Sequence, residues 1–433
     1  MALITAYWGL DGIIVLTTLM IIVYLYMTRN FKYWKKRGIS EIFPPTPFLG
    51  NFTECLLLRK APAYFLKELY EQAKGLPYFG LYIFDKPFLL VRDRELVKNI
   101  LIKDFNTFSD RYIMADPKDR LGCNNLFFMR NPTWKMLRMK LSPFFSSGKL
   151  KKMFELMLEC GNNLDTYLES LKEDGKEMIE VRELAAKFTT DVIGSTAYGL
   201  DVNSFKDPNA EFRKYEFDGD DLMAQAASFF SAGFETSSTT TAFALYELAL
   251  QPDIQSTLRK EIVEALDKSD GKITYDMTTS LPYLDMVVSE TLRMYPPLGY
   301  LNRMPSETYK VPNFDLVIEK DTPIYIPMLG LHYDPEYFPN PNKFDPERFN
   351  EENKRDRPAC VYFPFGEGPR ACIGTRLGIL QIKLALIIIL RKCEITPCKE
   401  TLIPMIIDPK GAMTVPLNGV IYLNFQKIKS SAL

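Results

Sequence analysis

The most informative part of the sequence is a loop rich in glycine and proline, Phe363-Pro364-Phe365-Gly366-Glu367-Gly368-Pro369-Arg370-Ala371-Cys372-Ile373-Gly374. It leads directly into an apolar run that begins at Thr375, so a helix is expected to follow it. Cys372 then lies near the positive end of a helix dipole, with Arg370 two residues away, and both features favour a thiolate. The three glycines let a flat ligand approach the backbone closely. A purely structural cysteine is the alternative.

The composition restricts what this cysteine can do. The chain has 433 residues, 47% of them apolar, and a net charge of −1, which excludes a disordered protein and gives no electrostatic reason to expect nucleic acid. His332 is the only histidine, so any metal site that needs two or three imidazoles is excluded. His332 as the general base of a cysteine hydrolase is the alternative to a structural hydrogen bonder. Seven cysteines without a CxxC pair favour a reducing compartment.

Working outward from the loop, Phe365, Gly368, Cys372 and Gly374 stand in the order F-x-x-G-x-x-x-C-x-G, which resembles the haem-thiolate signature of the cytochrome P450 family. The sequence is similar in particular to the insect microsomal enzymes of family six. Other segments resemble further motifs of that family, in the family's order: W-x-x-x-R at Trp134 and Arg138, A-G-x-x-T at Ala232 to Thr236, E-x-x-R at Glu290 and Arg293, and PERF at Pro346 to Phe349.

The resemblance implies a cytochrome P450 fold, mainly α with small β-sheets, and a role for each matching residue. Cys372 would be the axial metal ligand of haem b, next to Phe365. The resemblance assigns the haem propionates to four side chains: Trp134, Arg138, Arg303 and Arg370. It also makes Glu290, Arg293 and Arg348 a structural triad under the cysteine loop. From the residues alone, Glu290 and Arg293 are three apart on a helix, and a solvated ion pair is the alternative.

The oxygen-binding motif falls in a long apolar segment, Asp221 to Leu250, which Pro252 ends and which predicts a central buried helix. Gly233 and the hydroxyl-rich run from Thr236 to Thr241 are expected to weaken that helix locally. By resemblance, Glu235 and Thr236 form the acid–alcohol pair that relays protons, and Ala232 with Gly233 leaves room for O2. A second apolar helix, Leu377 to Leu390, is predicted to be a core helix and not a membrane span.

The implied activity is that of a monooxygenase that inserts one oxygen atom of O2 into lipophilic substrates, either xenobiotics such as plant toxins and insecticides or endogenous lipids and hormones. Phe229, Phe230, Phe234 and Leu298 are the candidate pocket residues. Electrons would come from NADPH through a flavoprotein reductase, with cytochrome b5 as a second candidate partner. The segment 130–152 has seven Lys or Arg and no acid, which suits an acidic redox partner, with solvated surface as the alternative.

The N-terminus predicts a single membrane anchor. Gly12 to Thr28 are 17 uncharged residues, and five basic residues follow between Arg29 and Arg37. The positive-inside rule keeps that flank and the rest of the chain cytosolic, on an endoplasmic reticulum membrane. A cleaved signal peptide, the alternative, carries its positive charge before the apolar run. We therefore expect an anchor over 1–28, a basic and proline-rich hinge over 29–51, and a catalytic domain over 52–433.

Two further expectations concern the interior of that domain. Leu81 to Phe84 and Phe88 to Arg92 are predicted strands, joined by a turn at Asp85-Lys86-Pro87. The sequence also departs from the family, which places several dozen residues, including two helices that roof the pocket, before the central helix. Here Tyr215 to Phe217 look joined across a gap. The second hypothesis is therefore a truncated splice or gene-model variant that binds haem but is catalytically impaired.

Overall fold

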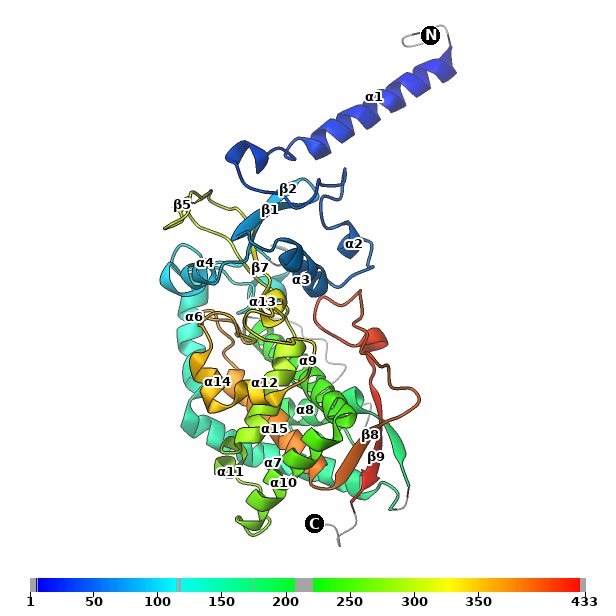
Figure 1. Cartoon of the computed structure of the whole chain (residues 1–433), viewed down its shortest axis with the longest axis vertical. Helices are drawn as coiled ribbons and strands as arrows, with labels where there is room; N and C mark the ends of the chain where they lie inside the picture. The colour runs from blue at the N-terminus through cyan, green and yellow to red at the C-terminus, as the bar shows by residue number, and fades with distance from the viewer. Residues whose placement is uncertain are drawn as a thin grey trace.

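The structure of the chain is a computed structural model, and it describes residues 5, 7–113, 115, 118–173, 175–206 and 221–428. Helices dominate this part of the chain, and strands are short (Figure 1). The α-helices are α1 (Trp8–Thr28), α2 (Thr53–Leu56), α3 (Pro62–Gln72), α4 (Arg94–Lys98), α5 (Arg120–Cys123), α6 (Thr133–Leu141), α7 (Ser147–Glu169), α8 (Val181–Tyr198), α9 (Asp221–Leu250), α10 (Pro252–Asp267), α11 (Tyr275–Thr279), α12 (Pro282–Met294), α13 (Met328–His332), α14 (Glu351–Asp356) and α15 (Thr375–Leu390).

In the described ranges, shorter helical turns and nine strands accompany these helices. The turns are η1 (Lys35–Arg37), η2 (Asn99–Lys103), η3 (Ser142–Phe145), η5 (Pro346–Phe349) and η6 (Leu417–Gly419). The strands are β1 (Tyr78–Ile83), β2 (Lys86–Val91), β3 (Glu177–Glu180), β4 (Leu301–Arg303), β5 (Tyr309–Lys310), β6 (Val317–Ile318), β7 (Ile324–Ile326), β8 (Cys393–Pro397) and β9 (Tyr422–Lys427). The prediction of a mainly α fold with small sheets is confirmed.

The strands form three small sheets. The first has the order β1-β2-β7-β4, in which β2 and β7 are parallel and the other pairs antiparallel. The second has the order β3-β9-β8, and the third pairs β5 with β6. The first sheet lies at the end of the molecule from which α1 projects, whereas the C-terminus lies at the opposite end (Figure 1). The sheets therefore border the helical part and do not divide it.

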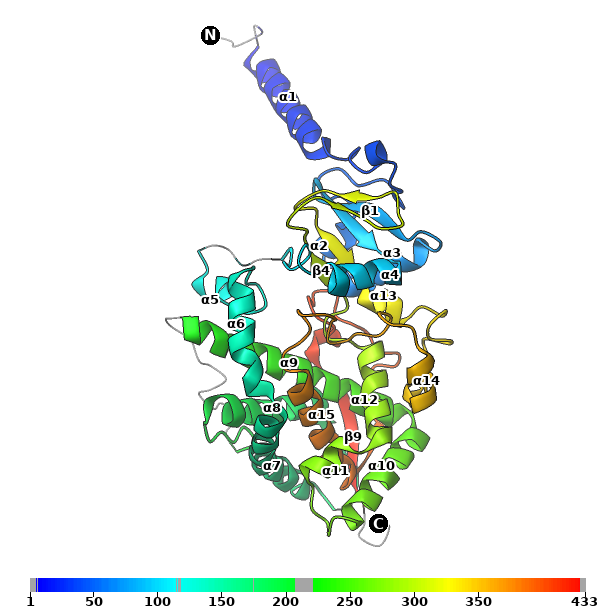
Figure 2. The ribbon, with the colours of Figure 1, turned by 90° about the vertical axis from the view of Figure 1, so that its left-hand side faces the viewer.

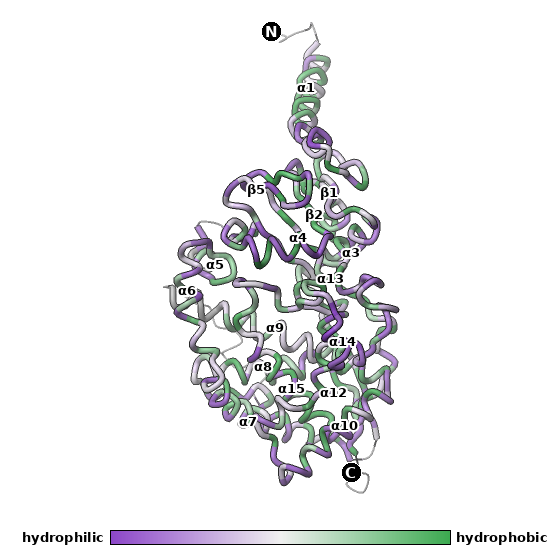
Figure 3. Tube along the Cα trace, turned by 60° about the vertical axis from the view of Figure 1, so that its left-hand side comes forward, coloured by the Kyte–Doolittle hydropathy of each residue, from purple (hydrophilic) through white to green (hydrophobic). Residues whose placement is uncertain are grey.

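Helix α1 extends away from the globular part and is apolar along most of its length (Figure 3). Among the described residues it is the one helix long and apolar enough to cross a membrane, a test that signal sequences also pass. It begins at Trp8, four residues before the predicted apolar run, so Asp11 falls in its first turn. The Asp11 carboxylate accepts a hydrogen bond from the backbone N–H of Thr5 at 2.6 Å.

The main hydrophobic core surrounds α9, which packs against α8, α12 and α15 (Figure 2). Helix α9 occupies the predicted residues, Asp221–Leu250, and it continues through Gly233 and the hydroxyl run. The expected local weakening does not interrupt the helix, and the hydroxyls of this run bond back to carbonyls of the helix itself. Thr236, Ser238 and Thr240 each donate to the carbonyl four residues earlier, at 2.6, 2.8 and 2.8 Å. The core position of α15 is confirmed.

The first hairpin differs in detail from its prediction. β1 and β2 pair Ile83 with Lys86, so the turn is only Phe84 and Asp85, and Lys86 and Pro87 belong to the second strand. Phe84 has a φ of 53°, in the left-handed region that a tight two-residue turn requires. The predicted three-residue turn was wrong because proline is a turn signal in sequence, while here its ring occupies a strand position opposite Tyr82.

Candidate functional site

The loop that carries Cys372 is closed by backbone hydrogen bonds. The N–H of Cys372 donates to the carbonyl of Phe365 at 2.8 Å, and the N–H of Gly366 donates to that of Phe363 at 2.8 Å. Gly368 has a φ of 71°, and a Cβ on it would lie 2.0 Å from the carbonyl oxygen of Leu101. The loop can take this path only with glycine at that position. The Cys372 side chain remains exposed. It lies two residues before Gly374, which is the N-cap residue of α15.

Arg370 is the best-anchored cation next to this cysteine. Its Nε donates to the carbonyl of Ser109 and its Nη2 to that of Met129, both at 2.8 Å. Its guanidinium carbon lies 4.2 Å from the ring centroid of Trp134 in α6, a cation–π contact. Arg370 is 4% exposed, and burial lowers its pKa to about 9. The sequence placed Arg370 and Trp134 at one site, and the structure brings them into contact.

Three more arginines gather around the same point. Burial lowers the pKa of Arg111 to about 10 and also lowers that of Arg138, while the charge of Cys372 opposes the shift in both. Arg303, in β4, is 1% exposed, and burial together with the charges of Arg111 and Arg370 holds its pKa well below its usual value. All four arginines therefore lie close to one another or to Cys372.

This cluster has too few acceptors of its own. Among the described residues, the one carboxylate paired with any of the four arginines is that of Asp110, 3.5 Å from Arg370 Nη2. Within the described part of the chain, the Nε atoms of Arg111 and Arg303 and the Nη1 atom of Arg370 are buried without a hydrogen-bond partner. Buried cations without counter-charges are costly, so the site is suited to a ligand with more than one carboxylate. Haem, with two propionates and an iron that accepts a thiolate, fits these residues.

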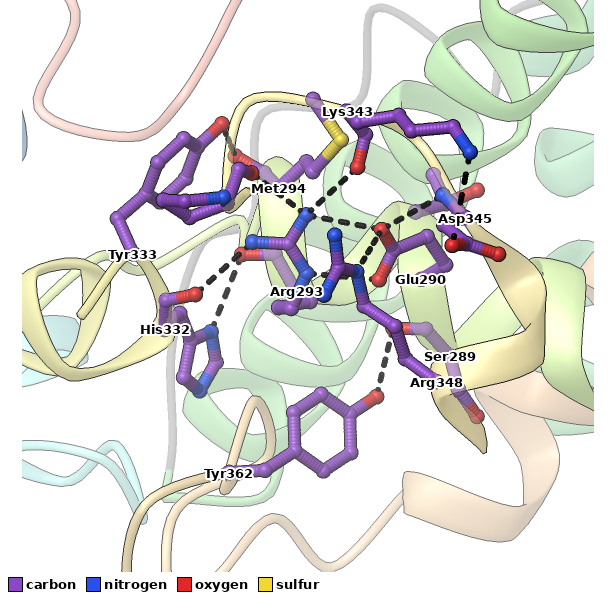
Figure 4. A network of polar contacts seen from close by, with 12 residues as sticks. Ser289, Glu290, Arg293, Met294, His332, Tyr333, Lys343, Asp345, Arg348 and Tyr362 are labelled. Carbon is purple, nitrogen blue, oxygen red and sulfur yellow. Dashed lines mark hydrogen bonds and ion pairs between the residues drawn. The ribbon is translucent and has the colours of Figure 1, made fainter. Parts of the chain in front are cut away.

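The predicted structural triad forms a buried network (Figure 4). Glu290 accepts two hydrogen bonds from Arg293, at 2.7 Å from Nε and 2.8 Å from Nη2, and both side chains are fully buried. Arg348 Nε lies 3.4 Å from Glu290 Oε1, which also accepts from the backbone N–H of Asp345 at 2.9 Å. The solvated ion pair that the spacing also allowed is therefore excluded, because the pair is fully buried.

On α9, the candidate proton-relay residues have partners that the sequence did not suggest. The Thr236 hydroxyl donates to the carbonyl of Ala232 at 2.6 Å. The Glu235 carboxylate forms a half-buried ion pair with Arg182 of α8. A Cβ on Gly233 would lie 2.7 Å from Ile193 Cδ1, so this glycine lets α8 and α9 approach closely. Glu235 is thus held toward α8.

Two functional candidates escaped the sequence reasoning, Arg111 and Arg182. Arg111 precedes Tyr112 in a segment with no motif spacing, so nothing in sequence marked it as a neighbour of Cys372. Arg182 lies 53 positions from Glu235, and one more basic residue at the start of a helix carries no signal. Pairing across such distances requires the fold. The predicted join near residues 215–217 lies outside the described residues.

The predicted pocket phenylalanines lie on α9. The rings of Phe230 and Phe234 are stacked with centroids 5.5 Å apart, and Phe229 contacts Phe145 at 5.9 Å. Phe145 also lies 3.9 Å from the position of a Cβ on Gly374, at the end of the cysteine loop. Aromatic rings of α9 therefore reach toward the same loop as the arginine cluster.

Comparison with known proteins agrees with this geometry. A family model described as Cytochrome P450 matches residues 41–216 and 211–423. Cytochrome P450 6k1 of Blattella germanica is 39% identical, with 95% of this chain and 96% of the relative covered. Cytochrome P450 6j1 of the same species is 40% identical, covering 96% and 98%. Probable cytochrome P450 6g2 of Drosophila melanogaster is 38% identical, covering 94% and 97%.

These alignments are longer than the chain itself. They extend over 507, 494 and 504 positions, whereas the chain has 433 residues. Each relative therefore has residues with no counterpart here.

Proposed function

Because the chain belongs to the cytochrome P450 family and is a monooxygenase of that family, we propose that Cys372 is its haem ligand and that its substrates are lipophilic. The observation that carries the proposal is the group of four arginines around the cysteine loop, which has buried N–H groups and almost no carboxylate of its own. Haem would be held by Cys372 and Phe365 of the loop and by five side chains around it: Arg111, Trp134, Arg138, Arg303 and Arg370.

Haem supplies the iron chemistry that activates dioxygen, and the chain's own residues control the surroundings of that reaction. Ala232 and Gly233 are the residues proposed to leave room for O2; Ala232 is exposed, whereas Ile193 of α8 already packs against Gly233. Thr236 holds its proton toward the carbonyl of Ala232, 2.6 Å away, and can rotate to deliver it. Glu235 is proposed to pass on the next proton, for which its carboxylate must first leave Arg182 and take up a proton from solvent.

The electron donor is proposed to be an NADPH-dependent flavoprotein reductase, with cytochrome b5 as a second donor. Six of the seven basic residues between 130 and 152 are exposed: Arg130, Lys135, Lys140, Lys149, Lys151 and Lys152. Of these, Lys151 lies 3.3 Å from Asp276, with both side chains mostly exposed. A largely unneutralised basic face supports docking of an acidic partner.

Membrane attachment at the endoplasmic reticulum is proposed to occur through α1 alone, with residues 52–433 forming the cytosolic catalytic domain. The exposure of α1 and its apolar composition support this arrangement. Residues 29–51 form the hinge, in which Arg29 pairs with Asp85 at 3.1 Å and Arg37 pairs with Glu319. Together with the buried Trp34, whose Nε1 donates to the carbonyl of Leu81 at 3.1 Å, these ion pairs fasten the hinge to the globular part.

The substrates are proposed to be xenobiotics, with endogenous lipids or hormones as the other class. Turnover of a lipophilic amine or terpene in the presence of reductase, NADPH and heavy-isotope dioxygen tests this directly. The expected product carries one labelled oxygen atom. Product without the label contradicts the proposal.

A second candidate, a shortened haem-binding variant with impaired catalysis, is favoured by the longer alignments with all three relatives. Residues absent between α8 and α9 would remove cover from the oxygen side, and water would then divert reducing equivalents to peroxide. The shortened variant and the full monooxygenase differ in one measurable ratio, the amount of labelled product formed per NADPH consumed. The variant consumes NADPH and forms peroxide without labelled product, whereas the monooxygenase couples the two.

A further inference from the structure

His332 lies between the buried charge network and the start of the cysteine loop (Figure 4). It is the only histidine of the chain, it is the last residue of α13, and its side chain has no exposed surface. Its ring packs against the ring of Tyr362 with centroids 5.2 Å apart and against that of Phe363 at 6.0 Å. The imidazole therefore contacts the first residues of the loop, several positions before Cys372 in the sequence.

The hydrogen bonds of His332 fix its tautomer. The backbone N–H of Phe363 donates to Nε2 at 3.2 Å, so Nε2 carries no proton. The proton of the neutral ring is then on Nδ1, which donates to the carbonyl of Arg293 at 3.2 Å. In return, Arg293 Nη1 donates a hydrogen bond to the backbone carbonyl of His332 at 2.9 Å. The ring thus joins α12 to the loop by a donor on one side and an acceptor on the other.

The surroundings keep this ring neutral. Burial lowers the pKa of His332 to about 3, and the positive charges of Arg293 and Arg357 lower it further, while the carbonyl of Arg293 opposes the shift. A protonated ring would have to give up its acceptor and place a second cation beside Arg293. Both hydrogen bonds therefore persist at neutral pH.

From Phe363, backbone hydrogen bonds continue to the cysteine. The carbonyl of Phe363 accepts from the N–H of Gly366, and the carbonyl of Phe365 accepts from the N–H of Cys372, both at 2.8 Å. A cavity of about 230 Å³ separates this part of the loop from α12, with Ser289 and Leu292 on the helix side. Across it, Tyr362 donates to the carbonyl of Ser289 at 2.9 Å. His332 forms a second polar bridge between α12 and the loop, through the carbonyl of Arg293 and the N–H of Phe363.

We propose that His332 is a positioning residue for Cys372. By accepting a hydrogen bond at Nε2, His332 holds the cysteine loop in register with the Glu290–Arg293 pair. This inference rests on the proposed function, because the consequence is the geometry of a thiolate ligand. It assigns the sole histidine neither to metal ligation nor to general-base chemistry.

Two conservative variants separate this role from simple packing. In His332→Gln the amide oxygen reaches the place of Nε2 and can accept from Phe363, whereas in His332→Asn the amide reaches only the place of Nδ1. The proposal predicts that the Gln variant keeps the thiolate Soret band of the reduced carbon monoxide complex and that the Asn variant loses most of it. Equal loss in both, or loss in neither, overturns it.

A matched control removes the effect of lower stability. Leu258, in α10, is fully buried in the main core and takes part in none of the hydrogen bonds described for His332, so Leu258→Ala is expected to lower stability and leave those bonds in place. The reduction potential of the haem is expected to shift in His332→Asn and to stay unchanged in Leu258→Ala and His332→Gln. The same shift in Leu258→Ala would mean that destabilisation alone explains the effect.

Nitrogen NMR of the unmodified full chain tests the tautomer of His332 independently of any substitution. With 15N-labelled histidine it yields the nitrogen signals of a single imidazole, and the proposal predicts a neutral ring protonated at Nδ1 from pH 5 to pH 8. A proton on Nε2, or titration in that range, contradicts it. If the unmodified chain lacks the thiolate band, the proposed function fails. The tautomer of His332 still tests the two hydrogen bonds of its ring, because that measurement requires no thiolate ligation.

Discussion

The guanidinium carbon of Arg370 lies 4.2 Å from the ring centroid of Trp134. This contact joins the cysteine loop to α6 and holds a cation at the site where we propose that a haem propionate binds. Because Arg370 also donates to the carbonyls of Ser109 and Met129, its charged end is fixed in direction before any ligand arrives. The site is in this sense preorganised.

Trp134→Leu is expected to speed the loss of haem. The substitution removes a cation–π contact worth about 1 to 2 kcal/mol and leaves Arg370 less well fixed. Haem transfer from the variant to an excess of apomyoglobin should be about fivefold faster or more. Arg376→Ala serves as the control, since Arg376 is exposed and its side chain bonds, among the described residues, only to the hydroxyl of Ser147. An unchanged rate in Trp134→Leu would contradict the role of the pair.

Arg303→Met is expected to have opposite effects on the haem-free and haem-bound protein. Arg303 is 1% exposed, and its side chain makes one hydrogen bond to the residues that the structure describes, from Nη1 to the carbonyl of Asn302 at 2.8 Å. Removing a buried, unpaired cation should raise the urea midpoint of the haem-free protein, while weakening haem binding at least fivefold. If haem affinity is unchanged, Arg303 does not contact a propionate.

Glu235→Gln and Arg182→Gln break the same ion pair but are expected to differ in coupling. Only the first removes the acid, so it should lower product formed per NADPH about tenfold or more and raise peroxide. Arg182→Gln frees the carboxylate of Glu235 and should keep or raise coupling. Equal uncoupling in the two variants would show that the ion pair, and not the acid, is what matters.

The ion pair between Lys383 of α15 and Asp285 of α12 predicts an asymmetric stability effect. Lys383 Nζ lies 2.7 Å from Asp285 Oδ1, and the exposed fractions of the two side chains are 3% and 39%. Asp285→Asn leaves a buried ammonium without its counter-charge and should cost about 3 kcal/mol in urea unfolding. Lys383→Met should cost less than about 1 kcal/mol, because the remaining carboxylate reaches solvent. The reverse order would contradict this account.

The stability of the chain should depend on pH through His332. In the folded state burial lowers the pKa of His332 to about 3, whereas the unfolded value is about 6.5. Below pH 6.5 the unfolded chain binds a proton that the folded chain cannot, so stability falls as the pH decreases. Between pH 7 and pH 5 the loss is about 2 kcal/mol. The difference between the unmodified protein and His332→Gln in urea unfolding isolates this effect, and parallel curves would contradict it.

Some parts of this structure follow from local sequence. The bounds of α9 were predicted at Asp221 and Leu250 because an apolar run and Pro252 act within a few residues. The pair Glu290 and Arg293 was predicted because its spacing matches one helical turn. Their burial was only favoured, since a spacing of three residues also suits a solvated surface.

Other parts depend on contacts between distant segments. Arg111 approaches Cys372, Arg182 reaches Glu235, and His332 bridges Arg293 and Phe363, and in each case the partners lie dozens of positions apart. No periodicity or motif encodes such pairs, because they arise only when the helices pack. The hairpin turn failed for a different reason, since Pro87 entered a strand instead of the turn.

The central claim is that Cys372, beside the arginine cluster, provides a thiolate ligand to haem, and a reduced-plus-carbon-monoxide spectrum of the full chain tests it most directly. The account predicts the red-shifted Soret band typical of thiolate ligation, present in the unmodified protein and absent in Cys372→Ala. A missing band in correctly haem-loaded protein, or a band that persists in Cys372→Ala, would contradict it.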